Sequence, residues 1–215
     1  MTLTWHFLRV ALGVVLLMGQ ALAAPVEVEL VIYEVPELLW QAKFEGQFQE
    51  QPALKKRLDE EMQAGGLKQI LAVKGAVAED QPWIWRQGQE QEFAEGWETP
   101  EKPPAIPASR KKRFVGSAVE LRHEGLTEGG RLLVSLKLEH HLNPPKMRRI
   151  SYANAATGAE REKLSVEYPQ FDQIEWVGKL AVWQQWRKVT SVLRLSGSEA
   201  GLGSAMRYVV FIKRL

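Results

Sequence analysis

The feature that most restricts the fold is an alternation of apolar and polar residues over positions 131–140, in which Leu133 is the one apolar residue on the polar face. Charged side chains at Arg131, Lys137 and Glu139 fall on one face of an extended strand. Because successive side chains of a strand point to opposite faces, a shift of one residue would bury these three charges. The pattern therefore predicts a half-buried strand of well-specified register, whose inward residues are Leu132, Val134, Leu136 and Leu138.

The same alternation occurs on either side of this strand. Residues 114–121 precede it, and Thr127-Glu128-Gly129-Gly130 is typical of the turn between two antiparallel strands. A polar loop with Asn143-Pro144-Pro145 follows it. Three more strands are expected at 171–183, 188–195 and 206–214, the last two joined by a glycine- and serine-rich hairpin connection at 196–204. Residues 114–215 are therefore predicted to form an antiparallel β region.

The preceding part, residues 24–96, predicts a βααββ opening region. Its first strand, 26–34, places Val26, Val28, Leu30 and Ile32 on one face, with Glu27 and Glu29 beginning the other, which predicts a half-buried strand. Two helices follow. One begins at Pro36 with Leu38, Leu39 and Ala42 on one side, and the other runs from Pro52 to Gly65-Gly66 with Leu54, Leu58 and Met62 inward. Strands at 67–77 and 83–93 complete the region, and the whole is an α+β fold dominated by antiparallel β structure.

The second helix carries three charge pairs at i, i+4 spacing, expected on its solvent side. These pairs are Lys55–Asp59, Lys56–Glu60 and Arg57–Glu61.

Between the two regions, residues 97–113 change in character. Four prolines lack the N–H that a sheet ladder needs, and Arg110-Lys111-Lys112-Arg113 is a run of four positive charges. The segment is interpreted as a loop with a solvated basic tip; contact of this tip with acidic lipid headgroups or a partner is the alternative. The prolines are Pro100, Pro103, Pro104 and Pro107.

Residues 1–23 predict a cleavable signal peptide. Arg9 precedes an apolar core at 10–18, and Ala21-Leu22-Ala23 has the small-x-small form of a cleavage site. The apolar stretch 10–24 would form a helix of roughly 22 Å, short of the roughly 30 Å of a bilayer core, which disfavours an uncleaved anchor. The chain is therefore expected to be exported to the periplasm or outer membrane.

This expectation gives a first prediction. Mass spectrometry of the protein exported from cells that express the full chain should find its N-terminus near Ala24. An intact form that begins at Met1 and is recovered in the inner membrane would contradict it.

The residues give no pattern for catalysis, a cofactor or a metal. The chain has no cysteine and no Gly-x-Ser-x-Gly nucleophile turn. The adjacent His140 and His141 would point to opposite faces of a strand, so these two and His123 are interpreted as histidines at strand ends on the surface. The glycines at 197, 201 and 203 lack the Gly-Lys-Ser/Thr of a phosphate loop. We therefore expect a non-enzymatic protein with no catalytic, cofactor-binding or metal-binding residues and no small-molecule substrate.

Charge and tryptophan content bear on partners. Loss of Arg9 with the signal peptide would lower the formal net charge from +2 to +1, which gives no reason to expect a nucleic acid. Seven of the eight tryptophans lie beyond residue 23, and Trp83 and Trp85 share one strand face. Core packing is the first interpretation, and a belt at a membrane or subunit contact is the alternative.

The order of these segments resembles the C-terminal domain of bacterial secretins, the outer-membrane ring proteins of type II and type III secretion systems. Val26–Val35 is similar to the family's V-x-V-E-x-x-I-x-E-V strand, and Phe114–Leu121 to its x-V-G-x-x-L-x-V strand. Gly129–Leu136 is similar to G-x-I-x-L-x-L, and Tyr168–Phe171 contains P-x-F. The family's Pro-x-Leu-Gly segment is missing, and its usual ring-building domains do not precede Val26, so the resemblance is to a divergent, truncated member.

The resemblance implies a structural component of protein secretion or pilus assembly at the outer membrane. It implies self-association or binding to secretion-system proteins, and contact with the outer membrane. The alternative is a soluble periplasmic β-rich binding module, in which the strands close a monomeric sandwich and the tryptophans line a groove.

Overall fold

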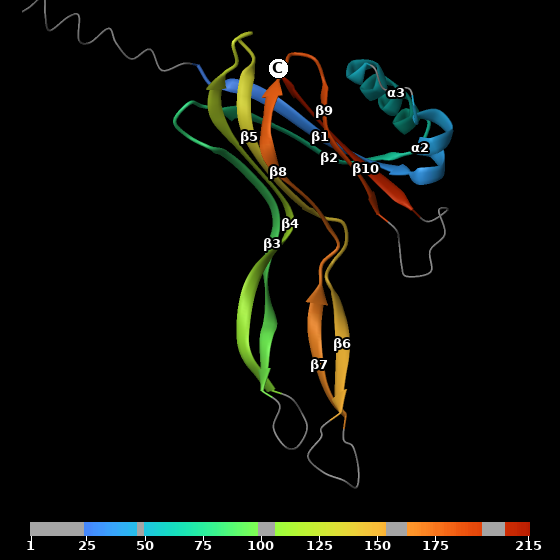
Figure 1. The fold of residues 1–215 in the computed structure, drawn as a ribbon, viewed down its shortest axis with the longest axis vertical. Coiled ribbons are helices and arrows are strands. Elements are labelled where there is room, and N and C mark those ends of the chain that lie inside the picture. Colours follow the sequence, from blue (N-terminus) through green and yellow to red (C-terminus); the bar gives the residue numbers. More distant parts are fainter. Residues whose placement is uncertain (1–23, 47–49, 99–105, 154–162, 195–204) are drawn as a thin grey trace, which may run out of the picture.

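A computed structural model describes residues 24–46, 50–98, 106–153, 163–194 and 205–215, and it confirms the α+β fold dominated by antiparallel strands (Figure 1). One four-stranded sheet has the order β2 (Lys68–Val77), β1 (Val26–Pro36), β10 (Met206–Arg214), β9 (Arg187–Arg194). The other has the order β3 (Trp83–Glu98), β4 (Ile106–Leu126), β5 (Leu132–His141), β8 (Gln173–Val182). A separate two-stranded ribbon is formed by β6 (Lys146–Ala153) and β7 (Lys163–Gln170).

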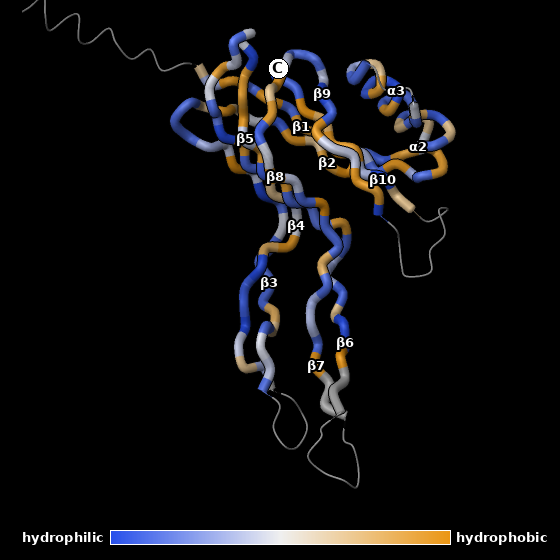
Figure 2. Tube along the Cα trace, viewed as in Figure 1, coloured by the Kyte–Doolittle hydropathy of each residue, from blue (hydrophilic) through white to orange (hydrophobic). Residues whose placement is uncertain are grey.

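The main core lies between the two four-stranded sheets. The predicted inward residues of β5 are each at most 1% exposed, as are Val28, Leu30 and Ile32 of β1. Figure 2 shows hydrophobic residues concentrated along these strands. The turn that sets the register of β4 against β5 is also as predicted: Gly130 has φ +69°, and its N–H donates to the Thr127 carbonyl.

Two helices cover the other face of the first sheet. They are α2 (Glu37–Lys43) and α3 (Gln51–Gln63), and Leu54 and Leu58 of α3 pack in a second core beneath them. The expectation of a half-buried first strand was therefore wrong. Val31, Tyr33 and Val35 on the second face of β1 are buried against the helices, so β1 is covered on both sides.

The predicted apolar face of the first helix was right only for Leu39, which packs against this second core. Leu38 is 55% exposed and Ala42 is exposed as well; the buried residues are instead Glu37, Trp40 and Phe44. The carboxylate of Glu37 can be buried because Arg207 of β10 donates two hydrogen bonds to it, both 2.7 Å long. The tertiary partner therefore overrides the apolar pattern of this short helix.

The charge pairs of α3 do not all face solvent. Lys55 is 6% exposed, bonds to Asp59, and lies over the rings of Tyr33 and Trp186. Lys56 pairs with Glu60 at the surface, as predicted. Glu61 pairs with Lys43 of α2, while the Arg57 guanidinium lies over the Phe44 ring.

The segment 97–113 is not a loop in its described part. β3 extends to Glu98, and β4 begins at Ile106, so Arg110 to Arg113 lie within a long antiparallel hairpin. Pro107 is accommodated at the far end, opposite Trp97, next to a register shift in the ladder. The segment expected as a polar loop after residue 143 likewise includes the unpredicted ribbon β6–β7. Residues 1–23, 99–105 and 195–204, where the signal peptide, three of the prolines and the glycine-rich connection lie, are outside the described residues.

The two helices of the described residues are both short. Neither is long and apolar enough to cross a membrane.

Candidate functional site

Two hairpins project from the sandwich, side by side (Figure 1). β5 pairs with β4 only from Ser117 onward, so from Gly116 back to Ile106 β4 pairs with β3 alone. The β6–β7 ribbon pairs only with itself within the part of the chain that the structure describes. We call these the β3–β4 arm and the β6–β7 arm.

The β3–β4 arm leaves the sheet at a pair of facing glycines. Gly88 and Gly116 are opposite each other in the ladder and have φ of +156° and +152°. A Cβ atom on Gly88 would lie 2.3 Å from the Val115 carbonyl oxygen, and one on Gly116 would lie 2.2 Å from the Gln87 carbonyl oxygen. A side chain at either position would therefore collide with backbone, so this close approach of the two strands requires glycine.

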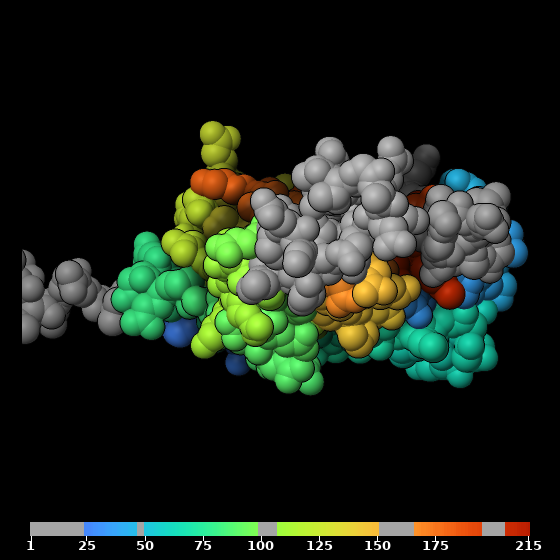
Figure 3. All heavy atoms as spheres, turned by 90° about the horizontal axis from the view of Figure 1, so that it is seen from below, coloured from blue at the N-terminus to red at the C-terminus, as the bar shows by residue number. Residues whose placement is uncertain are grey.

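Aromatic rings join the two arms. Phe93 of β3 meets Phe171, which follows β7, edge to face at 5.4 Å between ring centres. Trp97 of β3 lies 6.4 Å from Tyr168 of β7. Seen along the arms from their ends, β3–β4 and β6–β7 lie next to each other (Figure 3). The arms are therefore held together near Phe93 and again near Trp97.

Part of the basic run is neutralised within its own arm. Glu95 of β3 accepts a 2.9 Å hydrogen bond from Arg113, and Lys111 lies 3.7 Å from the same carboxylate. The hydrogen bond from Arg113 lowers the pKa of Glu95. The run is exposed to solvent, as predicted, but the expectation of a loop tip was wrong, because all four residues lie within β4.

Two of the three predicted histidines, His140 and His141, lie near the base of the β3–β4 arm. His140 Nδ1 is 2.7 Å from Ser117 Oγ. Burial lowers the pKa of His140, and the neighbouring His141 lowers it further. The His141 side chain is only 3% exposed, with Nδ1 3.0 Å from the Gly116 carbonyl oxygen and its ring on Phe171. The expectation of a surface position was therefore wrong for His141. This residue contacts both arms, at Gly116 of β4 and at Phe171 after β7. Within the described residues, no group of three or more His, Asp or Glu side chains could hold a metal ion.

Most of the tryptophans take part in packing. Trp40 is 3% exposed in the core beneath the helices, and Trp186 packs against that core. Others lie partly buried against the core between the sheets: Trp83, Trp85 and Trp176.

Sequence reasoning did not find the β6–β7 arm. Its strand β6 exposes apolar side chains on both faces, with Met147 49% and Ile150 36% exposed. The signal in the sequence is weak, because Arg148 and Arg149 interrupt the alternation. The alternation Leu164, Val166, Tyr168 in the partner strand is the pattern that could have shown it.

Comparison with known proteins gives structural neighbours only. No family model matches the chain, and no curated protein matches its sequence. One similar solved structure is the InvG secretin domain from the Salmonella SPI-1 injectisome, with 10% identity and a TM-score of 0.41; it covers 97% of this chain and 68% of that one. Another is the type II secretion system secretin GspD of E. coli K12, with 11% identity and a TM-score of 0.37, covering 97% of this chain and 53% of that one.

Proposed function

We propose that this chain is an exported, non-catalytic, secretin-like structural protein that assembles through its two arms at the outer membrane. The observation that carries the proposal is the pair of projecting arms, whose outer strand edges pair with no other described strand. β3 is an edge strand of 16 residues, and β6 and β7 each pair on one side only. Long edges favour pairing with another chain, because their N–H and C=O groups lack partners.

The β6–β7 arm has little to stabilise it within one chain, which favours association. A two-stranded ribbon is marginal in water by itself and becomes stable when it gains strands or a packing surface. β6 is exposed at every position from Lys146 to Ile150 and carries apolar side chains on both of its faces. Neighbouring copies that cover both faces would bury Met147 and Ile150.

Three of the four segments that resemble secretins lie in the framework that positions the arms, and the fourth, Tyr168–Phe171, lies at the end of β7 and just after it. Phe114–Leu121 forms the part of β4 where the arm joins its sheet, and Leu132–Leu136 is the part of β5 that pairs with Leu121–Leu126 of β4. Val26–Val35 forms the central β1, between β2 and β10. The resemblance therefore mainly concerns the strands that support the arms. A neighbouring copy would pair with the projecting ends of the arms.

The state of association tests this proposal. Protein extracted in mild detergent from cells that express the full chain should form an assembly several times heavier than one chain, measured by light scattering. Ile150→Asp should reduce this mass by placing a charge in the contact. Leu38→Asp is the matched control, because Leu38 is 55% exposed on α2, away from the arms, and it should leave the mass unchanged.

A second candidate, the soluble periplasmic binding module, is favoured by one observation. The core between the sheets is closed within a single chain, by residues from both sheets. A protein that remains a clean monomer with and without detergent would overturn the assembly proposal and favour this module.

A further inference from the structure

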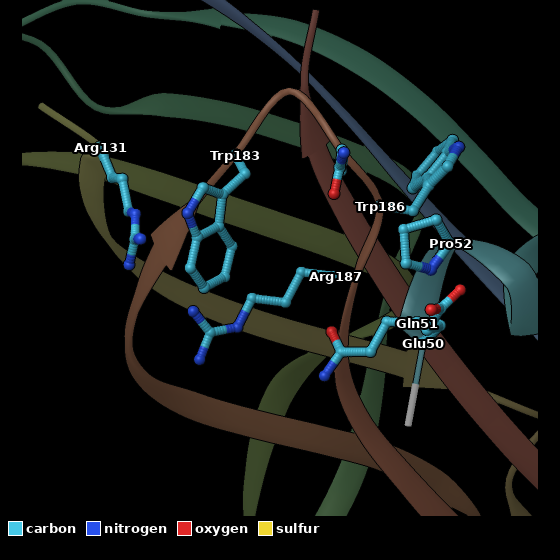
Figure 4. A pocket seen from close by; sticks show the side chains of 8 residues that line it. Glu50, Gln51, Pro52, Arg131, Trp183, Trp186 and Arg187 are labelled. Atoms are coloured by element: carbon cyan, nitrogen blue, oxygen red, sulfur yellow. The ribbon is translucent and has the colours of Figure 1, made fainter. Parts of the chain in front are cut away.

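A cationic pocket lies on the sandwich, at the connection between β8 and β9 (Figure 4). Its volume is about 710 Å³, and its walls come from the start of β5, the β8–β9 connection and the first residues of α3. Arg214 Nα donates to the Trp183 carbonyl oxygen at 2.6 Å, which ties the connection to the end of β10. The pocket therefore has a fixed framework of three elements.

Two arginines share one tryptophan in this pocket. The guanidinium carbon of Arg131 is 4.7 Å from the Trp183 ring centre, and that of Arg187 is 4.3 Å away. Figure 4 shows both guanidinium groups beside the indole. Arg187 also donates to the Ala181 carbonyl at 3.0 Å, which fixes its side chain. Neither arginine forms an ion pair with a carboxylate among the described residues.

The two charges are close enough to affect each other. Burial lowers the pKa of Arg187, and the charge of Arg131 lowers it further. A neighbouring pocket of about 440 Å³ shares Arg131 and Trp183 and adds Arg214, a third cation. Glu50 is the one acidic side chain among the described residues that line the two pockets. A bound anion would relieve this excess of positive charge.

The other polar groups suit a peptide. Gln51 accepts the Lys188 backbone N–H through Oε1 at 3.0 Å, which leaves its amide NH₂ able to donate. Gln185 lines both pockets with a second amide. Guanidinium groups bind carboxylates through paired hydrogen bonds in one plane, and stacking on an aromatic ring holds a guanidinium in a fixed plane.

We propose that this pocket binds a carboxylate-rich peptide segment of a partner protein. A volume of about 710 Å³ exceeds the space that one small inorganic anion fills, so a chain segment is the better occupant. A lipid surface fits less well, because none of the exposed large apolar side chains of the described residues lines either pocket. This inference does not depend on assembly through the arms.

The test uses protein purified from cells that express the full chain and two labelled probes, octaglutamate and octaglutamine. Octaglutamate should bind saturably and octaglutamine should not. Arg131→Gln should weaken octaglutamate binding about tenfold or more, as expected for loss of a charged hydrogen-bond donor. Arg131→Lys should weaken it less, because it keeps the charge and loses the planar fork. Arg131 is exposed and its guanidinium lies against the Trp183 ring, so these variants should fold.

Arg86→Gln is the matched control, because Arg86 also lies over a ring, that of Phe114, and removal of its charge changes the net charge equally. It should leave binding unchanged. Equal weakening by Arg86→Gln and Arg131→Gln, or absence of saturable octaglutamate binding, would overturn the proposal. The proposal would also be overturned if inorganic phosphate competed as strongly as unlabelled octaglutamate. It would likewise be overturned if the protein bound phosphatidylglycerol vesicles through Arg131 and did not bind the peptide.

Discussion

Val134→Pro is expected to prevent the chain from folding. Val134 is fully buried in β5, a central strand, and pairs with His123 of β4 and Leu180 of β8. Proline removes a ladder donor from the interior of the sheet, where proline is essentially not found, and the valine contacts of the core are lost as well. A domain is stable by only about 5–15 kcal/mol, so circular dichroism should show loss of β structure and protease should digest the chain rapidly.

Glu128→Pro is the matched control for this substitution. Glu128 is exposed and lies second in the Thr127–Gly130 turn, where proline is favoured. The same new residue, six positions away, should leave the spectrum and protease resistance unchanged. A folded, protease-resistant Val134→Pro protein would show that the β5 ladder is not essential to the sandwich.

The strands of the sandwich could be predicted because their pattern is local. A strand with one face in a core and one in water alternates strictly, and β5 shows this with four apolar residues inward. The second face of β1 could not be predicted, because the helices that cover Val31 and Tyr33 are placed by contacts outside that strand.

Most of the arms was not predicted because much of their surface is exposed. An alternating pattern arises from burial on one face, and most of β6 and residues 86–90 of β3 are exposed; only β7 carries such a pattern. Four prolines close together suggested a break at 97–113, yet Pro107 sits where a register shift relaxes the ladder.

The cationic pocket is a product of tertiary structure. Arg131 immediately precedes β5 of one sheet, Arg187 begins β9 of the other, and Trp183 lies on the connection between β8 and β9. Single residues of these types are common on surfaces. Only the return of β8 beside β5 brings Trp183 next to Arg131, which no local pattern specifies.

Glu37→Ala is expected to lower the free energy of unfolding by about 3 kcal/mol, the lower end of the range for breaking a buried ion pair. Glu37 is 2% exposed, and its two oxygens accept one hydrogen bond each from Arg207, whose side chain is 20% exposed. Alanine would leave that guanidinium against Trp40 without its carboxylate. Urea denaturation of the two proteins measures the difference.

The contribution of Glu37 to the free energy of unfolding should fall as the pH is lowered into the acid range. The hydrogen bonds from Arg207 lower the pKa of Glu37 below its ordinary value. A carboxylate with a lowered pKa stabilises the fold fully above its unfolded pKa of about 4.3, and this contribution is lost as the pH falls through the folded value. The gap between wild type and Glu37→Ala should therefore be constant near neutral pH and shrink in acid. Glu124→Ala is the control, because it breaks the exposed Glu124–Lys179 pair, which solvent screens, and it should cost much less stability than Glu37→Ala. Equal losses for the two variants, or a gap that grows in acid, would show that Glu37 does not act as a buried anion.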